Sequence, residues 1–65
     1  MNTSTDDEIL ASARRACAKA TELLADGSTA AAEYFRTAAS EYRRVGYSSV
    51  ADLMASQALA CEPAS

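Results

Sequence analysis

The chain of 65 residues contains no histidine and no tryptophan, and its two glycines lie far apart. Histidine titrates near neutral pH and is the commonest metal ligand, so its absence removes the usual centre of acid–base and zinc chemistry. A glycine-rich phosphate-binding loop is also excluded, because such a loop needs several glycines close together. The sequence therefore predicts no catalytic site, no cofactor, no metal site and no small-molecule substrate, and the protein is expected not to be an enzyme.

Cysteine is scarce too, since the chain has only Cys17 and Cys61. Two cysteines form no disulfide framework, and without histidine they lack the ligand spacing of a zinc site. The sequence shows neither an apolar run of membrane-spanning length nor a signal peptide, because its first residues are polar and acidic. These observations favour a cytoplasmic protein with free thiols, in which Cys17 acts as a small apolar side chain on a helix face.

Basic residues are outnumbered: six of them stand against nine acidic residues, and the net charge is -3. An acidic surface repels phosphate backbones and anionic lipids. The basic residues are expected to lie dispersed over a solvated surface: Arg14, Arg15, Lys19, Arg36, Arg43 and Arg44. The charge therefore predicts no binding to nucleic acid and no binding to membranes.

Alanine, by contrast, is abundant and follows a regular step. Two sets of alanines recur every 19 residues, one set seven positions after the other: Ala13, Ala32 and Ala51, and Ala20, Ala39 and Ala58. Residues seven apart lie on one face of an α-helix. Gly27 and Gly46 each precede the first alanine of their unit by five positions. The pattern predicts three similar helices, joined by two glycine turns, whose alanines mark where the backbones approach.

We therefore predict an all-α fold with a single small domain over residues 1–65. The helices are expected at about residues 6–25, 29–44 and 49–61. Because the turns are short, neighbouring helices should be antiparallel, in a compact bundle or a stacked hairpin. Residues 1–4 are expected to form a disordered tail, with Thr5 and Glu8 as a capping box after it. Pro63 is expected to end the third helix.

The expected core contains one apolar stripe from each helix. The stripes are Ile9, Ala13, Ala16, Ala20 and Leu23; Ala32, Phe35, Ala39 and Tyr42; and Ala51, Met54, Ala55, Ala58 and Leu59. A further stripe on the second helix suits the core and an interface equally: Ala31, Tyr34, Ala38 and Val45. Each alanine buries little area, so folding should depend on high helix propensity and on burial against a partner.

The stretch over residues 35–63 resembles one tetratricopeptide repeat. The positions that carry the resemblance are Tyr42, Gly46, Ala51, Ala58 and Pro63. The chain departs from the repeat where Ala39 replaces a glycine of the first helix and Ala55 replaces an aromatic of the second. More generally, the chain is similar to small three-helix relatives such as the microtubule-interacting-and-trafficking domain. The resemblance implies an antiparallel helix pair packed through small residues, and protein binding rather than catalysis.

Apolar residues outside the core stripes are the candidate partner-binding positions. Tyr34 and Leu53 occupy equivalent repeat positions and are expected to form one apolar patch. Leu10, Cys17 and Leu24 form a second stripe on the first helix, suited to a seam between two copies. The leading hypothesis is a small helical adaptor or regulator that binds a larger protein. Two alternatives stay open: a self-associating structural or scaffold protein, and a small inhibitor or accessory subunit encoded by a phage or plasmid.

Overall fold

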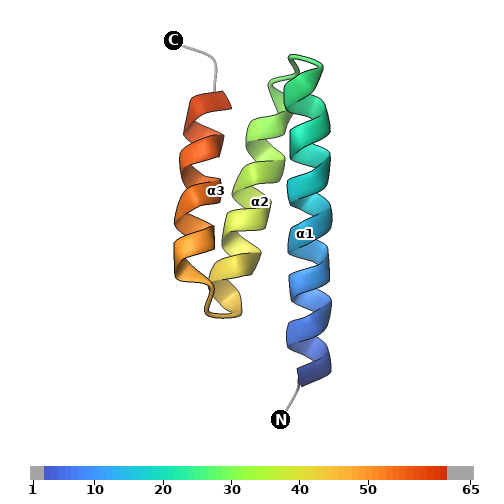
Figure 1. Cartoon of the computed structure of the whole chain (residues 1–65), viewed down its shortest axis with the longest axis vertical. Coiled ribbons are helices and arrows are strands. Elements are labelled where there is room, and N and C mark those ends of the chain that lie inside the picture. Colours follow the sequence, from blue (N-terminus) through green and yellow to red (C-terminus); the bar gives the residue numbers. More distant parts are fainter. Residues whose placement is uncertain (1–2, 62–65) are drawn as a thin grey trace.

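The computed structural model describes residues 3–61 and consists of three antiparallel α-helices in chain order (Figure 1). They are α1 (Thr3–Ala25), α2 (Ala30–Arg44) and α3 (Ser48–Cys61). No strand occurs in this part of the chain. The all-α prediction with three helices is therefore confirmed, and the predicted starts of α2 and α3 are each within one residue of the observed ones.

The helices lie side by side in a row with α2 in the middle (Figure 1). Helix α2 packs against both neighbours, whereas α1 and α3 barely contact one another. The Cα atoms span 44 × 18 × 13 Å, so the molecule is long and thin. Helix α1 has 23 residues against 15 and 14 in α2 and α3, and its N-terminal end extends past the α2–α3 turn (Figure 1). The chain thus forms one layer of helices, in which only α2 is covered from two sides.

Alanine makes up most of the core. Nine of the twelve buried hydrophobic residues are alanines, and the other three are Phe35, Tyr42 and Met54. All six alanines of the 19-residue step are buried, as the sequence predicted. Ala31 and Ala38 are fully buried as well, because α2 has a neighbour on each side. The second stripe of α2 therefore contributes these two alanines to the core, while Tyr34 in the same stripe stays exposed.

Both turns contain a glycine in the left-handed conformation. Gly27 and Gly46 have φ values of 76° and 87°, in the left-handed region that favours glycine. After α1, the Ser28 N–H donates to the Leu23 carbonyl (2.9 Å), and after α2, the Tyr47 N–H donates to the Tyr42 carbonyl (2.9 Å). Such bonds from beyond the helix end to its last turn define a Schellman motif. Both helices therefore end where the predicted glycines stand.

The second turn also has the apolar contact that often accompanies this motif. The Tyr47 ring stacks on the Tyr42 ring with centroids 6.1 Å apart and planes inclined by 30°. These two residues are the donor and acceptor of the same backbone bond, so the ring contact and the hydrogen bond join the same two positions of the turn. The first turn has Ser28 and Leu23 in the equivalent places. It instead gains a bond from the Ala30 N–H to the Ser28 hydroxyl (3.2 Å), which satisfies a free donor at the start of α2.

Replacing Gly46 with alanine should lower the free energy of unfolding by about 1–2 kcal/mol, the cost of a left-handed conformation for a residue with a Cβ atom. No atom lies within 4 Å of the added Cβ, so the backbone conformation alone is responsible. Urea titration followed by circular dichroism measures the change. Asparagine at the same position should cost less, since it tolerates this conformation. Equal stability of the alanine variant and the wild type would show that the turn is not left-handed in solution.

Two sequence predictions are wrong. Helix α1 begins at Thr3, so Thr5 lies inside the helix and the expected tail of residues 1–4 is already helical from its third residue. Leu59, expected in the core, is 70% exposed, because α3 packs on α2 alone and buries a narrow stripe around Ala51, Met54 and Ala58. The remaining tail residues and Pro63 lie outside the described residues.

Candidate functional site

The predicted seam on α1 is only partly available at the surface. Leu10 and Cys17 are half-buried and pack against the core cluster of their own chain. Leu24, near the end of the helix, is 46% exposed. The three residues share one face of α1, as their spacing of seven requires. Two of them, Leu10 and Cys17, already pack against the core of their own chain. Leu24 is therefore the member of this stripe that presents most of its side chain to a partner.

Tyr34 and Leu53 are both exposed, at 40% and 56%, and they lie at different heights of the helix row. The Arg43 guanidinium contacts the Asp52 carboxylate (3.1 Å), which indicates the register between antiparallel α2 and α3. In this register Leu53 lies level with Tyr42, eight residues from Tyr34. At ~1.5 Å per residue, the Cα atoms of the two residues are about 12 Å apart along the helix axis. The two exposed residues thus lie on neighbouring helices at different heights, and the shared patch stays a prediction.

Tyr34 lies instead in a small surface hollow of its own helix. The hollow has a volume of about 180 Å³ and is lined by Glu33, Tyr34 and Thr37. The Thr37 hydroxyl donates to the Glu33 carbonyl (3.0 Å), so it is already satisfied within the helix. This hollow therefore offers an aromatic ring beside one carboxylate, a surface for contact rather than a site for chemistry.

Leu59 and Tyr47 are exposed apolar residues that the sequence did not identify as partner positions. Leu59 is the most exposed large hydrophobic residue of the described chain, and Tyr47 is 47% exposed. The helical spacing of Leu59 fits a broad apolar stripe on α3, so only the knowledge that α3 has a single neighbour reveals its exposure. For Tyr47, a signal was present in the sequence, because an apolar residue directly after a helix-ending glycine often packs back on the last turn.

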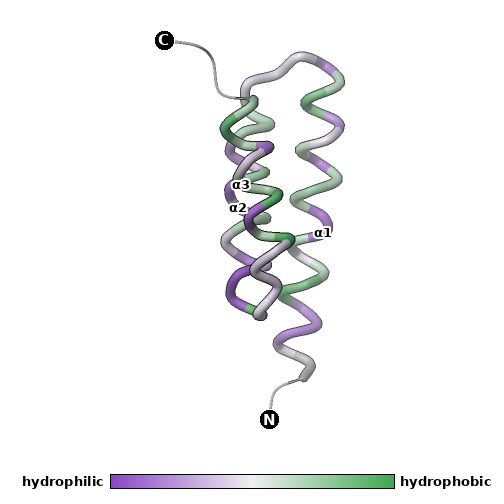
Figure 2. The backbone as a smooth tube through the Cα atoms, turned by 60° about the vertical axis from the view of Figure 1, so that its left-hand side comes forward, coloured by the Kyte–Doolittle hydropathy of each residue, from purple (hydrophilic) through white to green (hydrophobic). Residues whose placement is uncertain are grey.

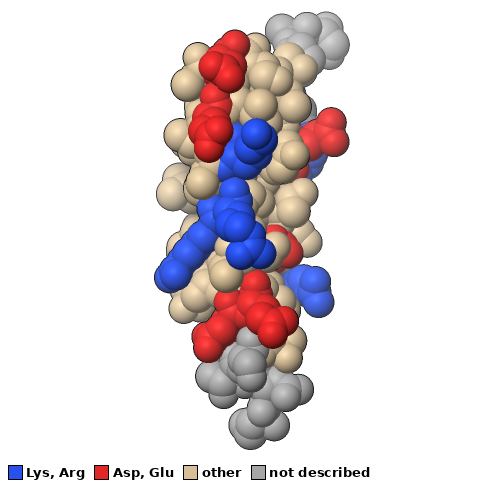
Figure 3. Space-filling view, turned by 90° about the vertical axis from the view of Figure 1, so that its right-hand side faces the viewer, with Lys and Arg blue, Asp and Glu red and all other residues tan. Residues whose placement is uncertain are grey.

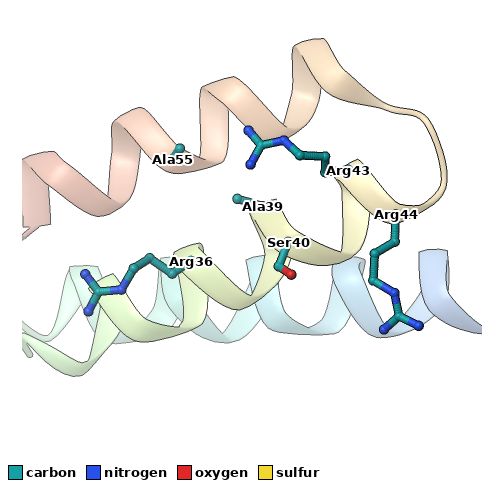
Figure 4. A pocket seen from close by; sticks show the side chains of 6 residues that line it. All are labelled: Arg36, Ala39, Ser40, Arg43, Arg44 and Ala55. Atoms are coloured by element: carbon teal, nitrogen blue, oxygen red, sulfur yellow. The ribbon is translucent and has the colours of Figure 1, made fainter.

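A groove of about 420 Å³ lies between α2 and α3 on one side of the layer. It is lined by Arg36, Ala39, Ser40, Arg43, Arg44 and Ala55. Arg43 extends toward α3, and Arg44 extends away from it (Figure 4). The small side chains of Ala39 and Ala55 leave the hollow that the arginines surround. The groove therefore combines an apolar floor with a cationic rim.

The basic residues are thus divided between two surfaces. Arg36, Arg43 and Arg44 surround the groove, whereas Arg14, Arg15 and Lys19 belong to α1. On the face that α1 presents, basic side chains lie in the middle and acidic side chains toward both ends (Figure 3). The expected dispersed surface therefore describes neither set, since the basic side chains gather in the middle of the α1 face and around the groove.

One polar contact joins α1 to α2. The Ser12 hydroxyl lies 3.0 Å from each carboxylate oxygen of Glu41, and the pair is partly buried. This bond shows that the face of α2 with Glu41 and Ala38 is turned toward α1, because residues three apart share a helix face. The two side chains satisfy one another's hydrogen bonding between α1 and α2. We therefore assign them a role in holding the two helices together rather than in binding a partner.

Comparison with known proteins gives no match to a family model, to a curated protein or to a solved structure. Within residues 3–61, no cluster of three or more histidine, cysteine, aspartate or glutamate side chains could hold a metal ion, and Cys17 and Cys61 are free thiols. None of the described helices combines the length and the apolar character needed to cross a membrane. The geometry of the surface is therefore the basis for a functional assignment.

Proposed function

We propose that the chain is a non-enzymatic protein-binding module, a small helical adaptor or regulator that docks on a larger protein. One observation carries the proposal: five large apolar side chains are exposed, whereas nine of the twelve buried hydrophobic residues are alanines. The exposed ones are Leu24, Tyr34, Tyr47, Leu53 and Leu59. Figure 2 shows hydrophobic positions distributed along all three helices, in line with apolar residues both in the core and on the surface.

The energetics of burial support this reading. Burying a leucine or phenylalanine side chain contributes about 1.5–3 kcal/mol, whereas an alanine methyl contributes much less. A chain of this size with an alanine core is therefore marginal alone. When another protein covers the exposed apolar side chains, their burial contributes further favourable free energy. Because α1 and α3 each pack on α2 alone, both outer helices have faces on which a partner helix can lie.

Leu53 and Tyr34 provide the test, because each can be changed without touching the alanine core. The proposal includes a cytoplasmic location, so wild-type protein is immobilised under reducing conditions in a lysate of the organism that encodes it. We expect a retained protein whose capture falls at least about tenfold with Leu53→Glu or Tyr34→Glu, since a buried unpaired carboxylate is costly. Mass spectrometry identifies and quantifies the retained protein.

Thr21→Glu is the matched control, since it adds the same charge at an exposed position of α1. Circular dichroism must show unchanged helicity in all three variants. Capture that is insensitive to every exposed apolar position would contradict the proposal. A molecular mass that rises with concentration, measured by sedimentation, would identify the partner as a second copy of the chain.

A further inference from the structure

The groove between α2 and α3 has an ordered cationic wall. Arg36, Ser40 and Arg44 follow one another at steps of four, so they form a stripe along one face of α2. All three are exposed, and all three line the groove. The Cα atoms of Arg36 and Arg44 lie about 12 Å apart along the helix at ~1.5 Å per residue, with Ser40 between them. Residues two turns apart on a second helix have the same separation.

One arginine of the groove already binds a carboxylate of its own chain. The exposed Asp52 carboxylate of α3 contacts the Arg43 guanidinium at 3.1 Å. Among residues 3–61, by contrast, no hydrogen bond or ion pair holds Arg44. The pair of Arg43 and Asp52 is an example, within the chain, of the contact that we expect between Arg44 and an incoming carboxylate. Arginine suits this role, since its planar guanidinium can donate two parallel hydrogen bonds to one carboxylate.

The floor of the groove is apolar, and an exposed leucine follows it on α3. Ala39 and Ala55 form the floor, and Leu59 lies one helical turn after Ala55 on the same side of α3. In the register set by Arg43 and Asp52, Leu59 lies level with Arg36. The most exposed leucine of the described chain thus stands at the end of the cationic wall. A ligand that fits both features needs carboxylates on one edge and apolar side chains on the other.

We infer that this groove binds an acidic amphipathic segment of the partner protein, with its carboxylates on Arg36 and Arg44 and an apolar side chain on Leu59. The inference rests on the proposed function and names the chemistry of the partner. A protein segment fits better than a nucleic acid, because the alanine floor and Leu59 match leucine or alanine side chains, not sugars.

Nuclear magnetic resonance titration of the full chain tests the groove directly. The probe is a peptide of three Glu-Leu-Ala-Glu-Ala units, and its counterpart has glutamine in place of every glutamate. We expect the acidic peptide to shift the amide signals of Ser40, Arg44 and Ala55, and the glutamine peptide to bind more weakly. The affinity should fall as salt is added, because exposed ion pairs are screened.

Arg36→Gln with Arg44→Gln should weaken binding of the acidic peptide about fivefold or more. Arg14→Gln with Arg15→Gln is the matched control, since it removes the same charge from α1 and should leave the affinity nearly unchanged. Equal losses in the two variants would overturn the inference, because they would report net charge alone. Absent shifts, shifts confined to α1, tighter binding of an oligothymidylate, or the same shifts from raised protein concentration alone would overturn it as well.

The groove and the proposed function can fail separately. If the partner captured from the lysate is still retained by the variant with Arg36→Gln and Arg44→Gln, the inference about the groove fails and the binding module stands. If the wild type captures nothing that depends on its exposed apolar residues, the proposed function fails whatever the peptide does.

Discussion

Replacing Phe35 with alanine should leave the chain largely unfolded at 25 °C. Phe35 is 4% exposed and lies on α2, the helix that both neighbours cover. Removing a buried phenylalanine side chain costs about 3–5 kcal/mol, and the cost is highest where the surroundings cannot collapse into the cavity. Here most of the surrounding residues are alanines, whose short side chains cannot refill the space. A domain of this size seldom gains more than about 3–5 kcal/mol from its core, so the loss matches the whole stability.

Circular dichroism at 222 nm with and without urea measures this loss for Phe35→Ala. Leu53→Ala is the control, because it also truncates a large apolar residue to alanine but at a position that is 56% exposed. The control should keep its helicity and change the free energy of unfolding by less than about 1 kcal/mol. If both variants had the wild-type unfolding midpoint, Phe35 would not be part of the core.

The arrangement of helices was predictable because two signals agreed. The alanine step fixed which face of each helix carries the small residues, and those alanines are all buried. Gly27 and Gly46 fixed where α1 and α2 end, and both have the positive φ that such ends require. Periodicity and glycine placement are local properties of the sequence. They therefore predict helix faces and helix ends without knowledge of contacts between distant segments. The start of α1 had no comparably sharp signal, and the prediction there was wrong by three residues.

The number of neighbours of each helix was not predictable from periodicity. A stripe of apolar residues shows that a helix buries a face, but not whether a second helix covers the adjacent face. Ala31 and Ala38 are buried because α2 has two neighbours, and Leu59 is exposed because α3 has one. The same apolar pattern thus had opposite outcomes on two helices. That difference comes from the topology of the row, which depends on contacts between segments far apart in the sequence.

The candidate site was predictable in its residue types and not in its layout. Tyr34 and Leu53 are exposed, as expected, but the antiparallel register separates them along the helix axis. The arginine stripe had a signal in the sequence, since Arg36, Ser40 and Arg44 are spaced by four. The groove itself depends on Ala39 and Ala55 lying opposite one another, which the spacing of residues within one helix does not reveal.

Ala38→Leu should be the other strongly destabilising change, and it acts by the opposite mechanism. Ala38 is fully buried, on the face of α2 whose neighbouring Glu41 carboxylate accepts a bond from Ser12 of α1. The extra carbon atoms have no room unless α1 and α2 move apart. Overpacking of this kind costs about 1–3 kcal/mol, occasionally more, a large share of the stability of a small domain.

The matched control for Ala38→Leu is Ala18→Leu, which makes the same substitution at an exposed position of α1. Alanine and leucine are both strong helix formers, so neither change acts through helix propensity. In urea titrations the control should stay within about 0.5 kcal/mol of the wild type, whereas Ala38→Leu should unfold at a much lower urea concentration. A lower stability of Ala38→Leu than of Ala18→Leu would show that the distance between α1 and α2 depends on the small side chain of Ala38. Wild-type stability in both would mean that α1 can move away from α2 at no cost, and that the row of helices is not rigidly packed at this interface.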